Sequence, residues 1–191
     1  MGCPCSKLLK KRTKMIKQKV QKGPTLDDTH GRMTKEMSQE EVKEFNTKII
    51  YLRGEFEAMD LLQDNKLNMG EFMRLMRLLQ YPGGSQGAKQ VWLDLGLSER
   101  NFMNEDEYVN LMLKDEQLER ATSIWRDIYE KFDWDKSGWA STSDVETGLK
   151  ELLGGDISAE LKKNIAKMDE NKDGKIYYSN FLRMQLGMVK G

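Results

Sequence analysis

The stretch DENKDGKIYYSN, residues 169–180, decides the fold of this chain, together with its partner DWDKSGWASTSD, residues 133–144. In each stretch, side chains that carry oxygen stand at positions one, three and five of twelve, and a glycine stands sixth. The eighth residue is apolar, as expected where a short strand of one loop pairs with a second loop. The shared features are carried by Asp169, Asn171, Asp173, Gly174 and Ile176, and by Asp133, Asp135, Ser137, Gly138 and Ala140.

Apolar side chains precede both loops at helical spacing, which places them on one face of a helix. The two loops start 36 residues apart. Two further steps of about that interval lead back to Gly96 and then to Asp60, so starts at 60, 96, 133 and 169 form an internal repeat. The apolar residues before the last two loops are Trp125, Tyr129 and Phe132, and Leu161, Ile165 and Met168.

This pattern resembles the calcium loops of the EF-hand family over about residues 38 to 188. Calcium takes six to eight oxygens at about 2.3–2.6 Å, so a flexible loop has to supply carboxylates, amides and one carbonyl in a fixed order. The resemblance implies an all-α fold of two EF-hand pairs, with short antiparallel β contacts between paired loops. The predicted divisions are a basic arm and linker over 1–37, an N-terminal pair over 38–113 and a C-terminal pair over 114–191.

The third and fourth loops are the predicted ion sites. Asp144 stands at position twelve where the family has Glu, and its shorter side chain favours the smaller magnesium ion relative to calcium. Asn180 removes a charge from the same position of the fourth loop, so we expect the third loop to bind Ca²⁺ more strongly. An ion-free pair held together by its apolar helices is the alternative. The candidate ligands, including two position-seven carbonyls, are Asp133, Asp135, Ser137, Trp139, Ser141 and Asp144, and Asp169, Asn171, Asp173, Lys175 and Asn180.

The first loop is predicted to be weak or empty, and the second to be structural. Leu62 removes a ligand from the first loop, and Asn65 replaces its turning glycine, although Asn tolerates a left-handed backbone. In the second loop, Gly96 and Arg100 occupy ligand positions, and a cation there repels calcium. The weak candidates of the first loop, with Lys66 contributing its carbonyl, are Asp60, Asp64, Lys66, Asn68 and Glu71.

Helix signals complete the predicted architecture. Ser38 followed by Glu41 forms a capping box, from which a helix is expected to run to Met59. Residues 105–132 contain neither Pro nor Gly. A continuous connecting helix of about 28 residues is possible there, and a bend near residues 114–117 is equally allowed.

Net charge is zero, but it is distributed unevenly. Residues 1–22 carry eight Lys or Arg and no acid, which leaves 23 basic and 31 acidic groups in the remainder. No apolar run approaches the roughly 20 residues that a membrane-spanning helix needs. Cys3 and Cys5 are the two cysteines, so no disulfide framework is expected. These features predict a cytosolic protein in which a basic arm precedes an acidic body.

The N-terminus carries a possible lipidation signal in Gly2, Cys3 and Cys5. It is similar to the dually acylated N-termini of Src-type kinases and of some flagellar calcium-binding proteins, which implies myristate on the glycine and palmitate on a cysteine. One myristoyl chain binds membranes only marginally, so a second signal is needed, and the basic arm over residues 7–22 adds to it. The alternatives are a solvated arm, or a helix docked on an acidic protein or another polyanion. The predicted location is the cytosolic face of a membrane, with a cilium, flagellum or cytoskeleton as further options.

The function predicted from these features is that of a binding protein and not an enzyme, since the chain shows no catalytic Ser/His/Asp order and no phosphate-binding glycine loop. Methionines at helical spacing are either core residues or the lining of an apolar groove for a target protein helix. A membrane-anchored calcium sensor or adaptor leads, ahead of a constitutive scaffold in a cytoskeletal or ciliary assembly and of an ion buffer. No nucleic acid is expected as a partner. The methionines concerned are Met59, Met73, Met76, Met112, Met168 and Met184.

Overall fold

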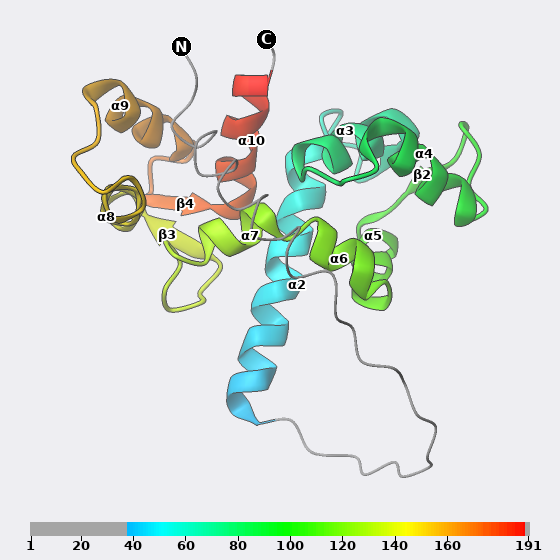
Figure 1. Cartoon of the computed structure of the whole chain (residues 1–191), viewed down its shortest axis with the longest axis horizontal. Helices are drawn as coiled ribbons and strands as arrows, with labels where there is room; N and C mark the ends of the chain where they lie inside the picture. The colour runs from blue at the N-terminus through cyan, green and yellow to red at the C-terminus, as the bar shows by residue number, and fades with distance from the viewer. Residues whose placement is uncertain (1–37, 190–191) are drawn as a thin grey trace.

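The computed structural model describes residues 38–189, so the predictions for the basic arm and for Gly2, Cys3 and Cys5 lie outside the described residues. The described part has the predicted all-α fold with two short antiparallel strand pairs (Figure 1). Its elements are α2 (Gln39–Met59), β1 (Leu67–Asn68), α3 (Met69–Leu78), α4 (Gly84–Asp94), β2 (Phe102–Met103), α5 (Glu105–Lys114), α6 (Glu116–Ala121), α7 (Ile124–Tyr129), β3 (Trp139–Ser141), α8 (Thr142–Leu153), α9 (Ala159–Met168), β4 (Lys175–Tyr177) and α10 (Tyr178–Val189).

The loops pair as the repeat predicts. Strand β1 pairs with β2 so that Leu67 lies opposite Met103, and β3 pairs with β4 so that Ala140 lies opposite Ile176. These four residues are the eighth of their loops, and all four side chains are buried. The strand contact therefore joins the first loop to the second and the third to the fourth.

Helix α2 begins at the predicted capping box. The Ser38 hydroxyl accepts a hydrogen bond from the Glu41 amide at 3.2 Å, and the Glu41 carboxylate accepts one from the Ser38 amide at 2.7 Å. The second half of the helix buries Leu52, Phe56 and Met59. The prediction of a helix from this box to residue 59 is confirmed.

The segment that connects the two pairs bends within residues 114–117, which was one of the two alternatives. The other alternative, a continuous helix, is wrong. Helix α5 ends at Lys114, and the Asp115 side chain caps α6 by accepting from the Leu118 amide at 2.9 Å. A second break follows at Thr122, whose hydroxyl donates to the Leu118 carbonyl at 2.9 Å. Short polar side chains compete for backbone hydrogen bonds in this way, which ends helices despite good intrinsic propensity elsewhere.

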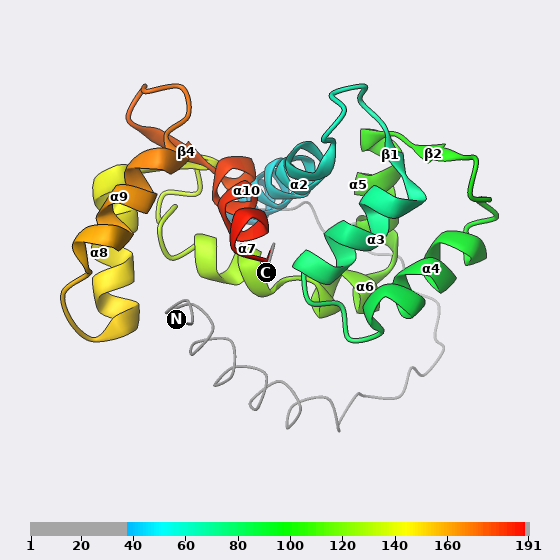
Figure 2. The same cartoon turned by 90° about the horizontal axis from the view of Figure 1, so that it is seen from above.

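Helices α2 and α10 lie side by side at the centre, with α8 and α9 on one side and α3 to α6 on the other (Figures 1 and 2). A Cβ atom at Gly54 of α2 would lie 3.3 Å from the Ser179 amide nitrogen of α10, so the absence of a side chain allows this close approach. One apolar core extends through both EF-hand pairs, and it includes most of the methionines predicted to be either core or groove. Met59, Met76, Met112 and Met168 are buried, and Met73 and Met184 are partly buried against the same core.

A buried polar cluster crosses this centre. The Glu55 carboxylate of α2 accepts hydrogen bonds from Arg126 of α7, from Tyr108 of α5 at 2.6 Å and from Tyr178 of α10 at 3.3 Å. Burial raises the pKa of Glu55, and the positive charge of Arg126 opposes that rise. One buried carboxylate of α2 thus connects this helix to α5, α7 and α10.

Candidate metal centre in the third loop

The first carboxylate of the third loop is buried and fully engaged. Asp133 is 1% exposed, and its Oδ1 accepts from the Ser137 amide at 2.8 Å. Its Oδ2 accepts from the Gly138 amide at 2.8 Å and from the Tyr51 hydroxyl at 2.7 Å. Burial and the neighbouring Asp133 raise the pKa of Tyr51 far above its usual range, so the hydroxyl keeps its proton and acts as a donor.

The remaining oxygens of the third loop are arranged around Ser137 and Ser141. Asp135 accepts from the Ser137 amide at 3.2 Å, and hydrogen bonding by Ser137 lowers the pKa of Asp135, which keeps this exposed carboxylate charged. The Ser137 hydroxyl lies 3.0 Å from the Trp139 carbonyl. Asp144 accepts from the Ser141 hydroxyl at 2.6 Å within the N-terminal cap of α8.

This donor set suits a hard divalent cation in its chemistry, since the candidate ligands are all oxygens and three are carboxylates. The carboxylates are not gathered, however: no group of three His, Cys, Asp or Glu side chains within residues 38–189 is arranged to hold a metal. Asp144 belongs to the helix cap instead of lying with Asp133 and Asp135. The chemical type of the donors thus fits Ca²⁺ or Mg²⁺, although the three carboxylates do not lie together. Asp133 is the candidate ligand with the most hydrogen bonds to hold it in place.

The fourth loop repeats the turn with less cover. Asp169 accepts from the Asp173 amide at 3.1 Å and from the Gly174 amide at 2.9 Å, and Asp173 accepts from the Lys175 amide at 2.9 Å. Asn171 is exposed, and Asn180 is buried at 7% exposure. The Lys175 ammonium lies 4.3 Å from the centroid of the Trp139 ring, so the position-seven residues of the two loops touch.

The first loop keeps its turn without a glycine. Asn65 has a φ of 58°, and its amide donates to Asp60 Oδ2 at 2.9 Å, so the expected left-handed turn is present. Asp64 accepts from the Lys66 amide at 3.1 Å. Glu71 caps α3 with Asn68, accepting from its amide at 3.0 Å, and Leu62 is 69% exposed at the missing ligand position.

The second loop closes by other means. The Trp92 indole donates to the Ser98 carbonyl at 3.0 Å, and the Ser98 amide donates to the Asn101 side chain at 2.7 Å. Gly96 at its start has a φ of 76° and offers no carboxylate. The structural role of the second loop stays a prediction.

A helix from the first hand packs against the third loop, and sequence reasoning did not foresee this. The Thr47 hydroxyl donates to the Lys136 carbonyl at 3.0 Å, and the Lys136 ammonium lies 2.6 Å from Glu44. Together with Tyr51 and Glu55, these polar residues recur every three or four positions and share one face of α2. That polar stripe was visible in the sequence and was the signal for a buried polar contact.

No protein-family model matches the chain. The chain is 33% identical over 78 residues to the 16 kDa calcium-binding protein of Schistosoma mansoni, covering 40% of this chain and 54% of that protein. It is 23% identical over 154 residues to troponin C, isoallergen Bla g 6.0301, of Blattella germanica, covering 79% of this chain and all of that protein. These matches support the EF-hand superfamily.

Calcium-dependent protein kinases match over a smaller share of their length. Calcium-dependent protein kinase 22 of Arabidopsis thaliana is 26% identical over 148 residues, which cover 78% of this chain and 28% of the kinase. Calcium-dependent protein kinase 19 is matched over 17% of its length. The chain thus spans about half the length of the 16 kDa relative and a smaller part of the length of the two kinases. The two relatives matched over more than half their length are the 16 kDa calcium-binding protein and troponin C, and neither name describes an enzymatic activity.

Proposed function

We propose that this EF-hand protein binds Ca²⁺ chiefly at its third loop and acts as a sensor or adaptor for a target protein. The observation that carries the proposal is the buried, fully oriented carboxylate of Asp133 in a loop with oxygen donors alone. Names of relatives that describe calcium binding or calcium dependence support the choice of ion.

Calorimetry with Ca²⁺ and with Mg²⁺ tests the ion site. Trp134 and Trp139 lie inside the third loop, so their fluorescence reports its occupancy. We expect Asp133→Ala to abolish the calcium-dependent fluorescence change, whereas Glu71→Gln in the first loop leaves it in place. Loss of the main binding event in the Glu71→Gln variant instead would overturn the ranking of the loops.

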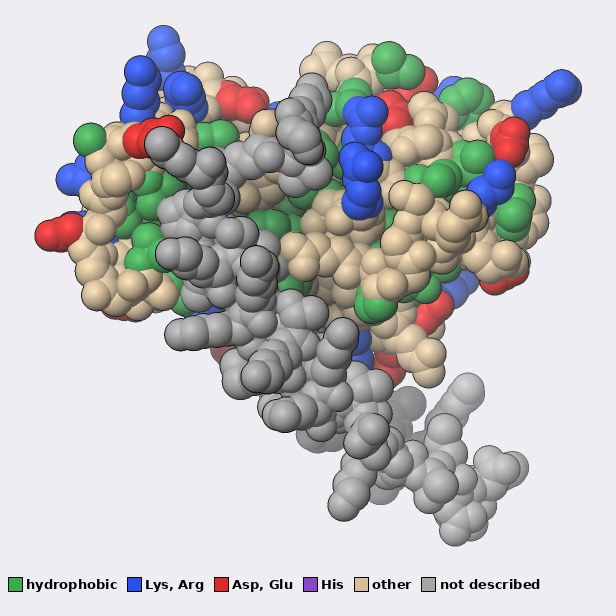
Figure 3. All heavy atoms as spheres, turned by 45° about the horizontal axis from the view of Figure 1, so that its top comes forward, with side chains coloured by type: hydrophobic (Ala, Val, Ile, Leu, Met, Phe, Trp, Pro, Cys, Tyr) green, Lys and Arg blue, Asp and Glu red, His purple; other side chains and the backbone are tan. Residues whose placement is uncertain are grey.

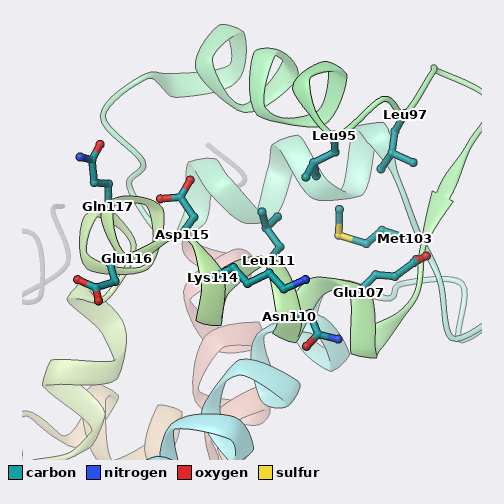
Figure 4. Close-up of a pocket in the computed structure, with 10 residues that line it drawn as sticks. All are labelled: Leu95, Leu97, Met103, Glu107, Asn110, Leu111, Lys114, Asp115, Glu116 and Gln117. Carbon is teal, nitrogen blue, oxygen red and sulfur yellow. The ribbon is translucent and has the colours of Figure 1, made fainter. Parts of the chain in front are cut away.

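A surface pocket supports a protein partner. About 930 Å³ of space lies between the end of α4, the second loop and α5, lined by Leu95, Leu97, Met103 and Leu111 on its apolar side (Figure 4). Glu107, Asp115 and Glu116 add negative charge around it, against the single cation of Lys114. An amphipathic helix with basic residues at its edge complements such a groove. Leu111→Asp is expected to abolish binding of that helix while leaving the ion titration unchanged.

Membrane attachment is proposed for the N-terminus, whose residues lie outside the described range. Within residues 38–189, no helix combines the length and apolar character needed to cross a bilayer. Acylation of Gly2 with Cys3 or Cys5, aided by the basic arm, is the proposed anchor at the cytosolic face. Gly2→Ala is then expected to release the protein from cell membranes on fractionation. Release by charge reversal at Lys10, Lys11 and Arg12, with Gly2→Ala still bound, would favour a polyanionic partner.

A constitutive scaffold is the second candidate, and the shared core favours it. Four of the methionines predicted to be core or groove residues are buried in the shared core, and the other two are partly buried against it, so exposing them requires the hands to rearrange. Acidic and basic side chains are interspersed over the described part of the face in Figure 3, instead of forming one basic patch for nucleic acid. Binding of a hydrophobic dye with and without Ca²⁺ separates the two: a rise in dye binding supports the sensor, and no change supports the scaffold.

A further inference from the structure

Helix α2 of the first hand runs past the loop that precedes β3 in the third hand (Figure 1). Three successive turns of α2 contact that loop. Glu44 pairs with the Lys136 ammonium, Thr47 donates to the Lys136 carbonyl, and Tyr51 donates to the Asp133 carboxylate. The loop is therefore held both by its own residues and by a helix about 80 residues earlier in the chain.

The two oxygens of Asp133 have different partners. Oδ2 takes one donor from α2 and one from the turning glycine, which occupies the two acceptor directions that a carboxylate oxygen offers. Oδ1 takes its donors from Ser137, which is itself a candidate ligand and whose hydroxyl can rotate. Tyr51 thus orients Oδ2, while Oδ1 keeps its hydrogen bonds within the loop.

The fourth loop lacks this arrangement. Its first carboxylate, Asp169, accepts from the backbone amides of Asp173 and Gly174. No side chain among residues 38–189 donates to it. The first loop is similar, since Asp60 accepts from the amides of Asp64 and Asn65. Within the described residues, support from a distant helix distinguishes the third loop from the other loops that begin with Asp.

We propose that Tyr51 is a positioning residue for the ion site of the third loop, so that ion affinity there depends on the docking of α2. The inference rests on the proposed calcium function. Partners that orient a metal ligand from outside the coordination sphere change affinity by about 10–100-fold when they are removed. Because such coupling is reciprocal, an ion in the third loop also strengthens the docking of α2. The first hand thereby contributes to calcium binding without a good ion site of its own.

The test compares Tyr51→Phe with Tyr108→Phe in the full chain. Each variant removes one buried hydroxyl that donates to a carboxylate, but the carboxylate that Tyr108 binds, Glu55, is not a candidate ion ligand. We expect Tyr51→Phe to weaken calcium binding at the third loop by about tenfold or more, while Tyr108→Phe stays close to wild type. Calorimetry and the fluorescence of Trp134 and Trp139 measure the calcium affinity of both variants.

Hydrogen exchange supplies a readout that a purely structural role does not move. In the wild type, adding Ca²⁺ is expected to slow amide exchange in the first half of α2, residues 40–51, and Tyr51→Phe is expected to remove that effect. Equal affinity and equal calcium-dependent protection in Tyr51→Phe and wild type would overturn the inference alone. A wild type that binds no ion at the third loop would overturn the proposed function and the inference with it.

Discussion

The third and fourth hands attach to α2 through arginines in different surroundings. Arg126 of α7 meets Glu55 of α2 in the core, with side chains 4% and 0% exposed. Arg183 of α10 meets Glu57 of α2 at 3.0 Å on the surface, where the side chains are 32% and 62% exposed. The same helix thus forms a desolvated charge pair with the third hand and a hydrated pair with the fourth. The first carboxylate of the third loop, Asp133, is buried against it, whereas Asp169 of the fourth loop is partly exposed.

The difference shows that twelve residues of loop sequence do not set the surroundings of an ion site. On ligands alone, the first half of the fourth loop, with Asp169, Asn171 and Asp173, is the better one. The structure gives the more enclosed carboxylate to the third loop, because a helix from another hand covers it. We therefore expect ion affinity to depend on packing as well as on ligand identity.

The largest expected effect comes from the two arginines. Arg126→Met leaves the Glu55 carboxylate buried without its counter-charge, which is expected to lower the free energy of unfolding by about 3–5 kcal/mol. Arg183→Met removes an exposed pair and is expected to cost about 0–1 kcal/mol. Urea unfolding of both variants in chelator measures the difference. Similar losses in the two variants would mean that desolvation does not decide how much each charge pair stabilises the protein.

A second pair of variants examines the turning glycines. Gly138 has a φ of 91° and a Cβ there would lie 2.8 Å from Cγ2 of Ile50 in α2, whereas Gly174 has a φ of 78° and open space around it. Gly174→Ala is expected to lower the free energy of unfolding by about 1–2 kcal/mol through backbone strain alone. Gly138→Ala is expected to cost about 1–3 kcal/mol more, because α2 has to move.

Thermal unfolding measures the two glycine variants, and Ile50→Ala provides the control. Shortening Ile50 removes the predicted clash, so Gly138→Ala in that background is expected to lose only the backbone share of its cost. If Gly138→Ala lowers the stability equally with and without Ile50→Ala, the Ile50 side chain of α2 does not pack against Gly138 of the third loop.

The smallest expected effect is on ion affinity at position twelve. Asn180→Glu restores the missing carboxylate at position twelve of the fourth loop. Asp144→Glu gives position twelve of the third loop the longer side chain that the family has. We expect calcium affinity to rise by about tenfold at each altered loop, since ligand charge and reach set affinity in these sites. Calorimetry resolves the two events. A fourth loop that overtakes the third in Asn180→Glu would show that ligand identity outweighs the cover given by α2.

Much of the fold was predictable because its signals are local. Ser38 and Glu41 mark the start of α2, and the apolar eighth residues mark the strand pairs. The turn at Asn65 followed from the tolerance of asparagine for a left-handed backbone. Each of these features depends on a few neighbouring residues, so a repeat along the chain was sufficient to place them.

What the sequence did not predict depends on contacts between distant segments. The break at Asp115 was left open because helix propensity and side-chain capping compete there with similar strength. The contacts of Thr47 and Tyr51 with the third loop join residues 89 and 82 positions apart. Glu55 gave a hint, since a carboxylate on the face shared with Leu52 and Met59 needs a buried partner, but the sequence did not name Arg126.

The close approach of Gly54 to Ser179 has a consequence for how the chain reaches its native state. The first described helix buries one face against the last, and Glu55 and Tyr178 are 123 residues apart. During synthesis from the N-terminus, α2 therefore leaves the ribosome well before the helix that covers it exists. Its contacts raise the mean sequence separation of the fold, which slows folding relative to a protein whose two pairs fold independently. The packing of α10 against α2 is thus expected to be a late step when the chain folds during synthesis.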